Sequence, residues 1–276
     1  EGEDADAARD RLAGRVRLRW GLCLVLPDGV PLPSDELRPG ERVLGLPALG
    51  PFGSGGHPTT RLILDLLVSP AGRERLGAAA AVCDFGCGSG VLALGALALG
   101  ARRAVGVDLD PAALVAACTN ALANGAAAPT APPRCLQQAS LAAEGRKGQE
   151  AVCGGGVLEL HLPPAEFLER DLDFYCRFGD WREARAAGGW APLPPGGDFG
   201  LVMANIVVGP LCRVAPTVAA LLQRPGPDSH GGEALLAGFR RGQQAQQVAE
   251  AYRAQGLQLE ALGALRGWAL LRARWP

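Results

Sequence analysis

The sequence lacks several features that would assign a chain to a class at once. Its 27 basic and 28 acidic side chains give a formal charge of −1, so it offers no broad positive field for nucleic-acid phosphates. The longest apolar run, Val91 to Ala101, is too short to cross a bilayer. Its eight cysteines include no C-x-x-C pair and no histidine cluster lies near them. These absences predict no direct nucleic-acid partner, no membrane span and no metal site.

The chain also lacks an initiator methionine, because it begins at Glu1. We therefore expect a processed chain or a fragment, in which a targeting segment is not observable. The expected compartment is the cytoplasm or an organelle, either chloroplast or mitochondrion. Nothing in the sequence indicates the oligomeric state.

Apolar material is abundant. Hydrophobic residues make up 48% of the 276 positions and charged residues 20%, which suits one large domain with attachments. Apolar periodicity predicts helices and strands in alternation. Helices are expected at 57–69, 90–99, 111–123, 209–222 and 243–254, and strands at 15–26, 80–83, 104–107, 157–161, 199–204, 234–237, 257–262 and 268–272. This alternation predicts an α/β fold with a mainly parallel sheet and helices on both faces, whose ligands lie beyond the carboxyl ends of the strands.

Composition divides the chain further. Residues 1–48 form an N-terminal segment rich in Pro and Gly toward its end, and residues 49–276 form the main domain. Within that domain, 125–156 and 171–197 are biased to Ala, Gly and Pro with weak periodicity. We expect both to be loop insertions that contribute little core, so that deletion of most of 125–156 should leave the domain folded.

A glycine-rich loop runs from Asp84 to Gly90, between a predicted strand and a predicted helix. The missing Cβ atoms of Gly86, Gly88 and Gly90 let the backbone turn sharply and approach a ligand. The helix that follows offers N–H groups suited to an anionic group. The alternative is that such a loop is only a turn. It is disfavoured because a strand, the loop, a helix and a second strand follow one another here in the order that a ligand-binding unit requires.

Asp108 lies 22 residues after Gly86, at the end of the next predicted strand. A carboxylate there can accept hydrogen bonds from both hydroxyls of a ribose, so the expected ligand is a nucleoside. A dinucleotide fingerprint would need a small residue at position 91, where Val91 stands. Nicotinamide cofactors are therefore disfavoured.

Three segments resemble the PrmA-type ribosomal protein methyltransferases, a family of class I S-adenosylmethionine-dependent enzymes. They are F-G-S-G-G-H-P-T-T at 52–60, D-F-G-C-G-S-G at 84–90 and M-A-N-I-V-V-G-P-L at 203–211. They occur in the family's order, and the resemblance covers the chain from Glu41 onward apart from the two insertions.

The resemblance implies a Rossmann-like class I methyltransferase fold with a seven-stranded sheet, and S-adenosylmethionine as cofactor. The implied contacts to the cofactor come from Thr60, Asp84, Gly86, Gly88, Gly90, Asp108 and Asn205, and Asn205 is also the implied catalytic residue. The implied activity is methylation of amino groups, lysine or N-terminal, on ribosomal protein L11. By the same comparison, residues 1–48 would be a truncated remnant of the family's substrate-recognition region.

Other interpretations remain open at this stage. The chain could methylate another protein, such as the electron-transfer flavoprotein, or a small molecule, or it could be a non-catalytic scaffold that keeps the cofactor pocket. Thr60 could simply begin a helix, and Asn205 could simply end a strand. His57 is read as a loop or packing residue, and Cys83 and Cys87 as small buried side chains.

Overall fold

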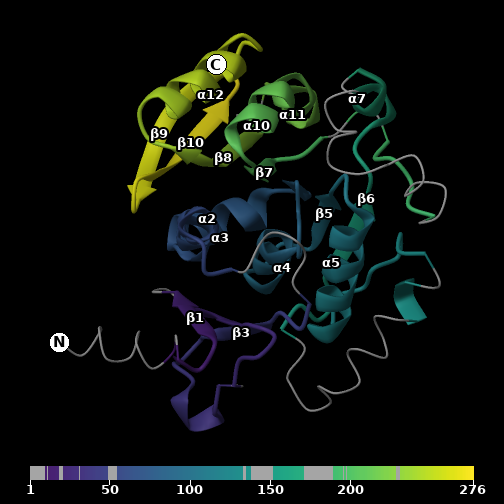
Figure 1. The fold of residues 1–276 in the computed structure, drawn as a ribbon, viewed down its shortest axis with the longest axis vertical. Coiled ribbons are helices and arrows are strands. Elements are labelled where there is room, and N and C mark those ends of the chain that lie inside the picture. The colour runs from purple at the N-terminus through teal and green to yellow at the C-terminus, as the bar shows by residue number, and fades with distance from the viewer. Residues whose placement is uncertain are drawn as a thin grey trace.

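The computed structural model describes residues 10, 12–18, 21–30, 32–48, 55–132, 135–137, 152–170, 189–194, 196, 198–227 and 231–276. Within these ranges the chain forms a small N-terminal sheet and a large α/β domain (Figure 1).

The large sheet has seven strands in the order β6-β5-β4-β7-β8-β10-β9. Neighbours from β6 to β8 pair in parallel, whereas β10 runs antiparallel to both β8 and β9. The strands are β4 (Val82–Phe85), β5 (Arg103–Val107), β6 (Val157–His161), β7 (Leu201–Asn205), β8 (Glu233–Arg240), β9 (Gln258–Leu265) and β10 (Trp268–Arg274). The expected α/β fold with a mainly parallel seven-stranded sheet is confirmed.

Helices cover both faces of this sheet (Figure 1). One face carries α2 (Pro58–Val68), α3 (Pro70–Ala78), α4 (Val91–Ala98) and α5 (Pro111–Ala123), and the other carries α7 (Ala165–Arg170), α10 (Val208–Arg213), α11 (Ala215–Leu221) and α12 (Gln243–Arg253). Because side chains alternate along a strand, Val202 lies in the core under α10–α12 and Met203 in the core under α2–α5. No helix in the described ranges is long and apolar enough to span a bilayer.

The N-terminal sheet consists of β1 (Arg15–Leu18), β2 (Leu22–Val25) and β3 (Arg42–Gly45), with a 3-10 turn η1 (Ser34–Glu36) before β3. β1 and β2 are antiparallel, and β2 and β3 are parallel. The prediction of one continuous strand over 15–26 is wrong, because Gly21 turns the chain back with a φ of +98°. Strand periodicity alone does not reveal such a turn.

Helix α4 is buried along its whole length, and its Val, Leu and Ala residues are at most 7% exposed. A helix without a polar face must be covered on every side. The large sheet covers one side, and the N-terminal sheet covers another: a Cβ added at Gly95 would lie 2.7 Å from Leu64 Cδ2 of α2 and 3.9 Å from Leu22 Cδ2 of β2.

The helix expected to stop at Pro70 does end there, as α2. A further helix, α3, follows at once, since Ser69 Oγ accepts a hydrogen bond from Gly72 N at 3.1 Å and Pro70 suits the first helical position. One helix prediction needs correction. The helix expected over 209–222 is divided into α10 and α11 around Val214. Pro216 has no N–H to continue the hydrogen bonds of α10, which accounts for the break.

The expectation of little core in the alanine-rich stretch after α5 is wrong where the structure describes it. Ala126, Ala128, Ala131, Cys135 and Cys153 are all buried in the core on the α5 side. Ala127 also pairs with Val157, the first residue of β6.

The described end of the second alanine- and glycine-rich stretch is also packed. Trp190 and Leu193 are buried, and Leu193 N donates to Leu162 O at 2.8 Å. The remaining parts of both stretches, 133–134, 138–151, 171–188, 195 and 197, lie outside the described residues.

Candidate active site

The glycine loop joins β4 to α4 and turns on three left-handed residues. The φ angles are +79° at Gly86, +53° at Gly88 and +76° at Gly90, which glycine adopts without strain. A Cβ at Gly86 would lie 2.8 Å from Ile206 Cγ1, and one at Gly90 would lie 3.0 Å from Ala117 Cβ. The loop therefore needs glycine for conformation and, at these two positions, for space.

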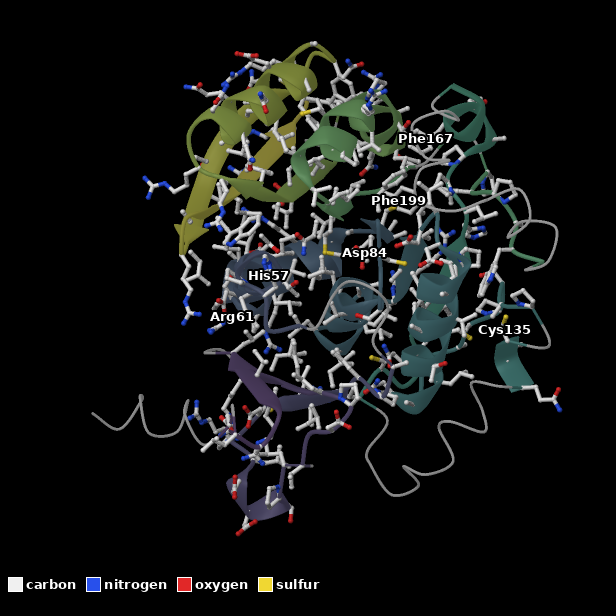
Figure 2. All side chains as sticks on the ribbon, viewed as in Figure 1. His57, Arg61, Asp84, Cys135, Phe167 and Phe199 are labelled. Carbon is white, nitrogen blue, oxygen red and sulfur yellow. The ribbon has the colours of Figure 1, made fainter. Side chains whose placement is uncertain are left out.

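Asp84 is the second-last residue of β4, directly before this loop, and lies between the two helical layers (Figure 2). Its carboxyl is 1% exposed, and Oδ2 accepts a hydrogen bond from Ala93 N in α4 at 3.1 Å. Oδ1 is buried and has no partner among the described residues. Burial raises the pKa of Asp84 to about 7, opposed by the Ala93 bond and reinforced by the charge of Asp108.

Asp108 follows β5, the position that its spacing predicts, and it is hydrogen-bonded to the loop. Oδ2 accepts a hydrogen bond from Gly88 N at 2.9 Å, and Oδ1 accepts one from Asp110 N at 3.0 Å. Burial raises the pKa of this carboxyl, and the two backbone donors oppose that shift. Each oxygen keeps lone-pair capacity, because an ionised carboxylate offers about four acceptor sites.

Asn205 and Thr60 lie in contact although 145 positions separate them. Asn205 ends β7, and its Nδ2 donates to Thr60 Oγ1 in the first turn of α2 at 3.2 Å. Thr60 is 1% exposed, whereas Asn205 is half-buried. His57 caps the same turn of α2, since its Nδ1 accepts from Thr59 N. His57 is exposed.

A second close backbone approach positions the segment after Asn205. Gly238 in β8 has a φ of +99°, and a Cβ there would lie 2.2 Å from Ile206 O. Ile206 N in turn donates to Ala237 O at 3.1 Å. The chain after Asn205 is thus pressed against β8, while the Ile206 side chain covers Gly86.

The sequence-predicted residues fall into two adjacent groups at the carboxyl edge of the sheet. Asp84, the three glycines and Asp108 form one group around the β4–α4 loop. Asn205 and Thr60 form the other, beside it, because β7 pairs with β4. Ile206 bridges the two groups through its contact with the loop. Their roles toward a ligand stay predictions.

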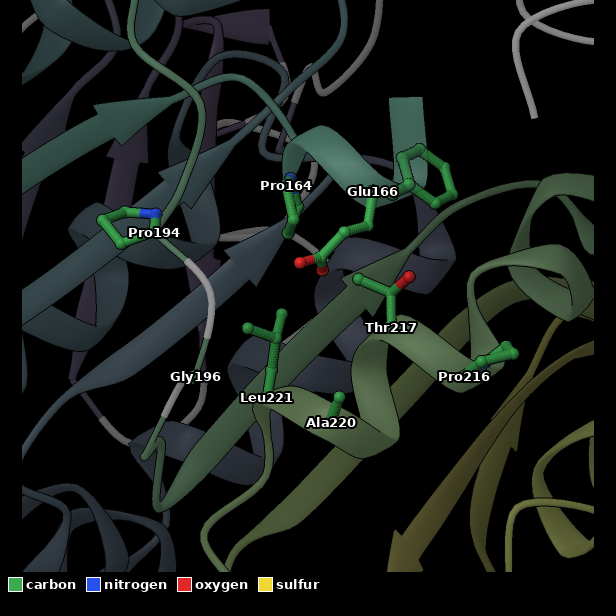
Figure 3. Close-up of a pocket in the computed structure, with 9 residues that line it drawn as sticks. Pro164, Glu166, Pro194, Gly196, Pro216, Thr217, Ala220 and Leu221 are labelled. Carbon is green, nitrogen blue, oxygen red and sulfur yellow. The ribbon is translucent and has the colours of Figure 1, made fainter. Parts of the chain in front are cut away.

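A separate cavity of about 150 Å³ lies between α7 and α11 (Figure 3). Its walls include Pro164, Pro194 and Thr217, and Glu166 extends into it (Figure 3). None of the seven predicted site residues lines it. It is therefore distinct from the candidate active site.

Comparison with known proteins bears on this arrangement. Residues 38–144 match the family model described as ribosomal protein L11 methyltransferase (PrmA). A ribosomal protein L11 methyltransferase of Azotobacter vinelandii is 36% identical over 250 residues, which are 91% of this chain and 62% of the relative. One of Chromohalobacter salexigens is 34% identical over 228 residues, 82% of this chain and 53% of the relative.

The chain is similar to the PrmA family over most of its own length. It spans only 53% and 62% of the length of these two relatives. The crystal structure of a ribosomal protein L11 methylase from Lactobacillus delbrueckii subsp. bulgaricus matches the fold, with a TM-score of 0.56 and 20% identity, over 95% of this chain and 98% of that one. S-adenosylmethionine is the cofactor that this similarity implies.

Asn120 is a residue of the candidate site that the sequence interpretation missed. Its Nδ2 donates to Ser89 O in the glycine loop at 2.8 Å and to Ala48 O at 2.7 Å, and its Oδ1 accepts from Ala48 N at 2.9 Å. The signal was an amide inside an otherwise apolar stretch of α5. Such a side chain in a buried helix face needs partners outside the helix.

Asn124 repeats this arrangement one turn later. Its Oδ1 accepts from Gly45 N at 3.0 Å, and its Nδ2 donates to Gly45 O at 2.7 Å. Together the two amides hold residues 45–48 as a neighbouring strand would. The N-terminal sheet is thereby fastened to the helix that supports the loop.

Cys83 and Cys87, which lie just before and within the glycine loop, are small buried side chains. Both are free, and burial raises the pKa of both thiols. Within the described ranges, no three His, Cys, Asp or Glu side chains gather as a metal site would need.

Proposed function

We propose that this chain is an S-adenosylmethionine-dependent methyltransferase that methylates amino groups of a protein. The observation that carries the proposal is the hydrogen bond from Gly88 N to Asp108, which joins the glycine loop to a ribose-binding carboxylate, next to the Asn205–Thr60 pair. On this proposal, a nucleoside site at Asp108 and an acceptor site at Asn205 adjoin at one edge of the sheet.

The residues present fit the cofactor. Asp108 would accept hydrogen bonds from the ribose hydroxyls with the lone pairs that its two backbone donors leave. The three glycines present no Cβ atoms, so the backbone can lie against the ligand. Asp84 keeps one oxygen unpaired for a donor. When bound, S-adenosylmethionine supplies an electrophilic methyl group on a positively charged sulfur.

Asn205 is suited to hold the acceptor amine. Because its Nδ2 donates to Thr60, the amide orientation is fixed and Oδ1 is left to accept a hydrogen bond from an amine. Thr60 is itself held in the capped first turn of α2. This pre-set geometry supports catalysis by positioning, where an error of about 1 Å can cost roughly a hundredfold in rate.

The acceptor must lose its proton before it can react. A lysine amine has an ordinary pKa of about 10.4, so neutralising it at about pH 7.5 costs roughly 4 kcal/mol, whereas an α-amine near 8 costs well under about 1 kcal/mol. Partial burial beside Asn205 lowers that cost, since desolvation favours the neutral amine.

Ribosomal protein L11 is the substrate that we propose. Support comes from the relatives, which bear that substrate in their names, and from the matched segment, which spans the loop and Asp108. A ribosomal partner places the chain in the cytoplasm or in an organelle that holds ribosomes. No direct nucleic-acid contact is needed, in keeping with the charge of −1.

Residues 1–48 are proposed to be the remaining part of a substrate-recognition region. Val30 and Leu37 there are 58% and 41% exposed, and exposed apolar side chains suit a protein partner. Changing both to Ser should raise KM for L11 and leave cofactor affinity unchanged. Unchanged KM would remove this region from substrate binding. We also propose that 125–156 and 171–197 are insertions into the methyltransferase domain.

Two measurements test the function. Calorimetric titration with S-adenosylmethionine and its demethylated product tests the pocket. Transfer of labelled methyl groups to purified L11, compared with ribosomal and organellar extracts, tests the substrate. Labelling of L11 supports the proposal, and labelling of a different protein or a small molecule replaces its substrate. Cofactor binding without any labelling would favour a non-catalytic scaffold.

A further inference from the structure

Three exposed arginines gather at the tip of the β9–β10 hairpin. They are Arg240 at the end of β8, Arg241 after it and Arg266 in the hairpin turn, and the ring of Trp268 lies beneath the guanidinium of Arg240. We call these four residues the arginine rim.

The rim is held in place by its backbone. Arg266 and Gly267 both have positive φ angles, +50° and +81°, as a tight two-residue hairpin turn requires. Arg266 is the one residue other than glycine with positive φ in the described ranges. Arg241 N donates to Gly267 O at 3.0 Å, and Arg240 Nη1 donates to Arg266 O at 3.3 Å.

Trp268 joins the rim to the candidate acceptor site. The Arg240 guanidinium lies 4.3 Å from the centre of the Trp268 ring. The same ring also contacts His57, edge to face at 4.8 Å. His57 caps the helix turn that carries Thr60, the partner of Asn205. In Figure 2 His57 and Arg61 lie where α2 faces this hairpin.

The positive charge of the rim is unmatched. Arg240, Arg241 and Arg266 form no ion pair in the part of the chain that the structure describes, whereas Arg272 in the same hairpin pairs with Glu233 and Glu260. Val207, two residues after Asn205, adds an apolar side chain that is 60% exposed. The surface beside the acceptor site thus combines cations, an aromatic ring and an aliphatic group.

We propose that the arginine rim binds carboxylates that flank the acceptor amine in the polypeptide substrate. This inference rests on the proposed function and adds a sequence preference to it: an amine with Asp or Glu nearby. Opposite charges beside a reacting group fix register and speed encounter. Three arginines on a chain of net charge −1 make too small a field for a nucleic acid, which contacts many phosphates at once.

The test uses two lysine peptides of equal length, one with Glu at the flanking positions and one with Gln. Binding is followed by fluorescence anisotropy in the presence of S-adenosylhomocysteine, so that the readout does not depend on turnover. The wild type should bind the Glu peptide roughly tenfold more tightly, and rising salt should erase the difference. Equal affinity for both peptides would overturn the inference.

The variant Arg241→Gln/Arg266→Gly removes two rim charges and places glycine where φ is positive, so the turn is kept. It should lose the preference while retaining the thermal midpoint and the cofactor affinity. Arg253→Gln is the control, because Arg253 is exposed at the far end of α12. Loss of the preference in this control would show that overall charge, not the rim, is responsible.

Two further outcomes are distinguished. If a labelled single-stranded RNA binds more tightly than the Glu peptide, and the double variant abolishes that binding, the rim serves a nucleic acid and the inference is overturned. If the Glu peptide binds through the rim but neither peptide nor L11 accepts methyl groups, the inference about the rim stands and the proposed function fails.

Discussion

The side-chain amide of Asn120 donates a hydrogen bond to the carbonyl oxygen of Ser89, at 2.8 Å. This bond joins α5 to the glycine loop, and the same amide also holds both backbone groups of Ala48. One buried side chain therefore fixes the loop and the chain that leads toward α2.

Asn120→Ala should lower the free energy of unfolding by about 2–3 kcal/mol, because three hydrogen bonds are lost and buried partners are left unsatisfied. Cofactor affinity should fall with it, since the loop loses a support. Chemical denaturation and calorimetry measure the two effects. Thr119→Ala is the matched control on the same helix, as its hydroxyl bonds only to Val115 O within α5. An equal loss in both variants would contradict the role of Asn120.

Asp108→Ala should weaken S-adenosylmethionine binding by about 1.5–3 kcal/mol, the range for loss of a charged hydrogen-bond partner. Asp110→Ala serves as control, because Asp110 caps α5 through Ala112 N and makes no bond to the glycine loop. The control should lose about 1 kcal/mol of stability and keep its affinity. Unchanged cofactor affinity in Asp108→Ala would remove this residue from the site.

Asn205→Ala should lower single-turnover methylation roughly a hundredfold at saturating cofactor, with a much smaller change in cofactor affinity. Thr60→Val should reproduce part of the loss, because the Asn205 amide would no longer be oriented. If turnover and affinity fall together, Asn205 holds the cofactor alone. Wild-type turnover would mean that it merely ends β7.

Asp84 should make stability depend on pH. Its pKa is raised to about 7 in the folded chain from an ordinary 3.8, so between these values the folded state binds more protons than the unfolded state. Asp84 therefore makes its whole contribution to the free energy of unfolding below about pH 4, and this contribution is lost as the pH rises through 7. Asp84→Asn should flatten this dependence and be more stable than the wild type above pH 7. The free energy of unfolding of both proteins, measured by denaturation from pH 4 to 8, tests this. If it changed with pH by the same amount in both, Asp84 would not be the source of the dependence.

Thr130→Val should destabilise the protein by about 1–2 kcal/mol, because Thr130 Oγ1 accepts from Leu160 N at 2.6 Å and donates to Leu160 O at 3.1 Å. Thermal unfolding measures the effect. If the thermal midpoint did not change, the segment around Thr130 would be a loop that contributes nothing to stability, as the sequence predicted.

The sequence allowed the fold to be predicted where local pattern and chemistry agree. The β4 loop, α4, β5 and Asp108 follow each other within one short stretch, and each element has its own signal. Asn205 and Thr60 were recognised separately through motifs, but their contact spans 145 positions and has no local signature. The parallel pairing of β7 with β4 is what brings Asn205 next to the glycine loop at the carboxyl edge of the sheet.

The failures share a physical cause. Ala126, Ala128 and Ala131 are buried, yet alanine occurs so often around them that no periodicity stands out. Their small side chains let the backbone lie close to β6. From composition alone, the same alanine-rich stretch is taken for a low-complexity loop. The arginine rim likewise depends on a turn that places Arg266 at positive φ, which its residue type does not suggest.

The wholly buried helix α4 also governs how the chain unfolds. The N-terminal sheet and the large sheet lie on different sides of it, so neither can leave without exposing apolar helix to water. We therefore expect the N-terminal sheet and the large domain to unfold together as one cooperative unit. A chain without the N-terminal sheet should expose part of α4 and tend to aggregate.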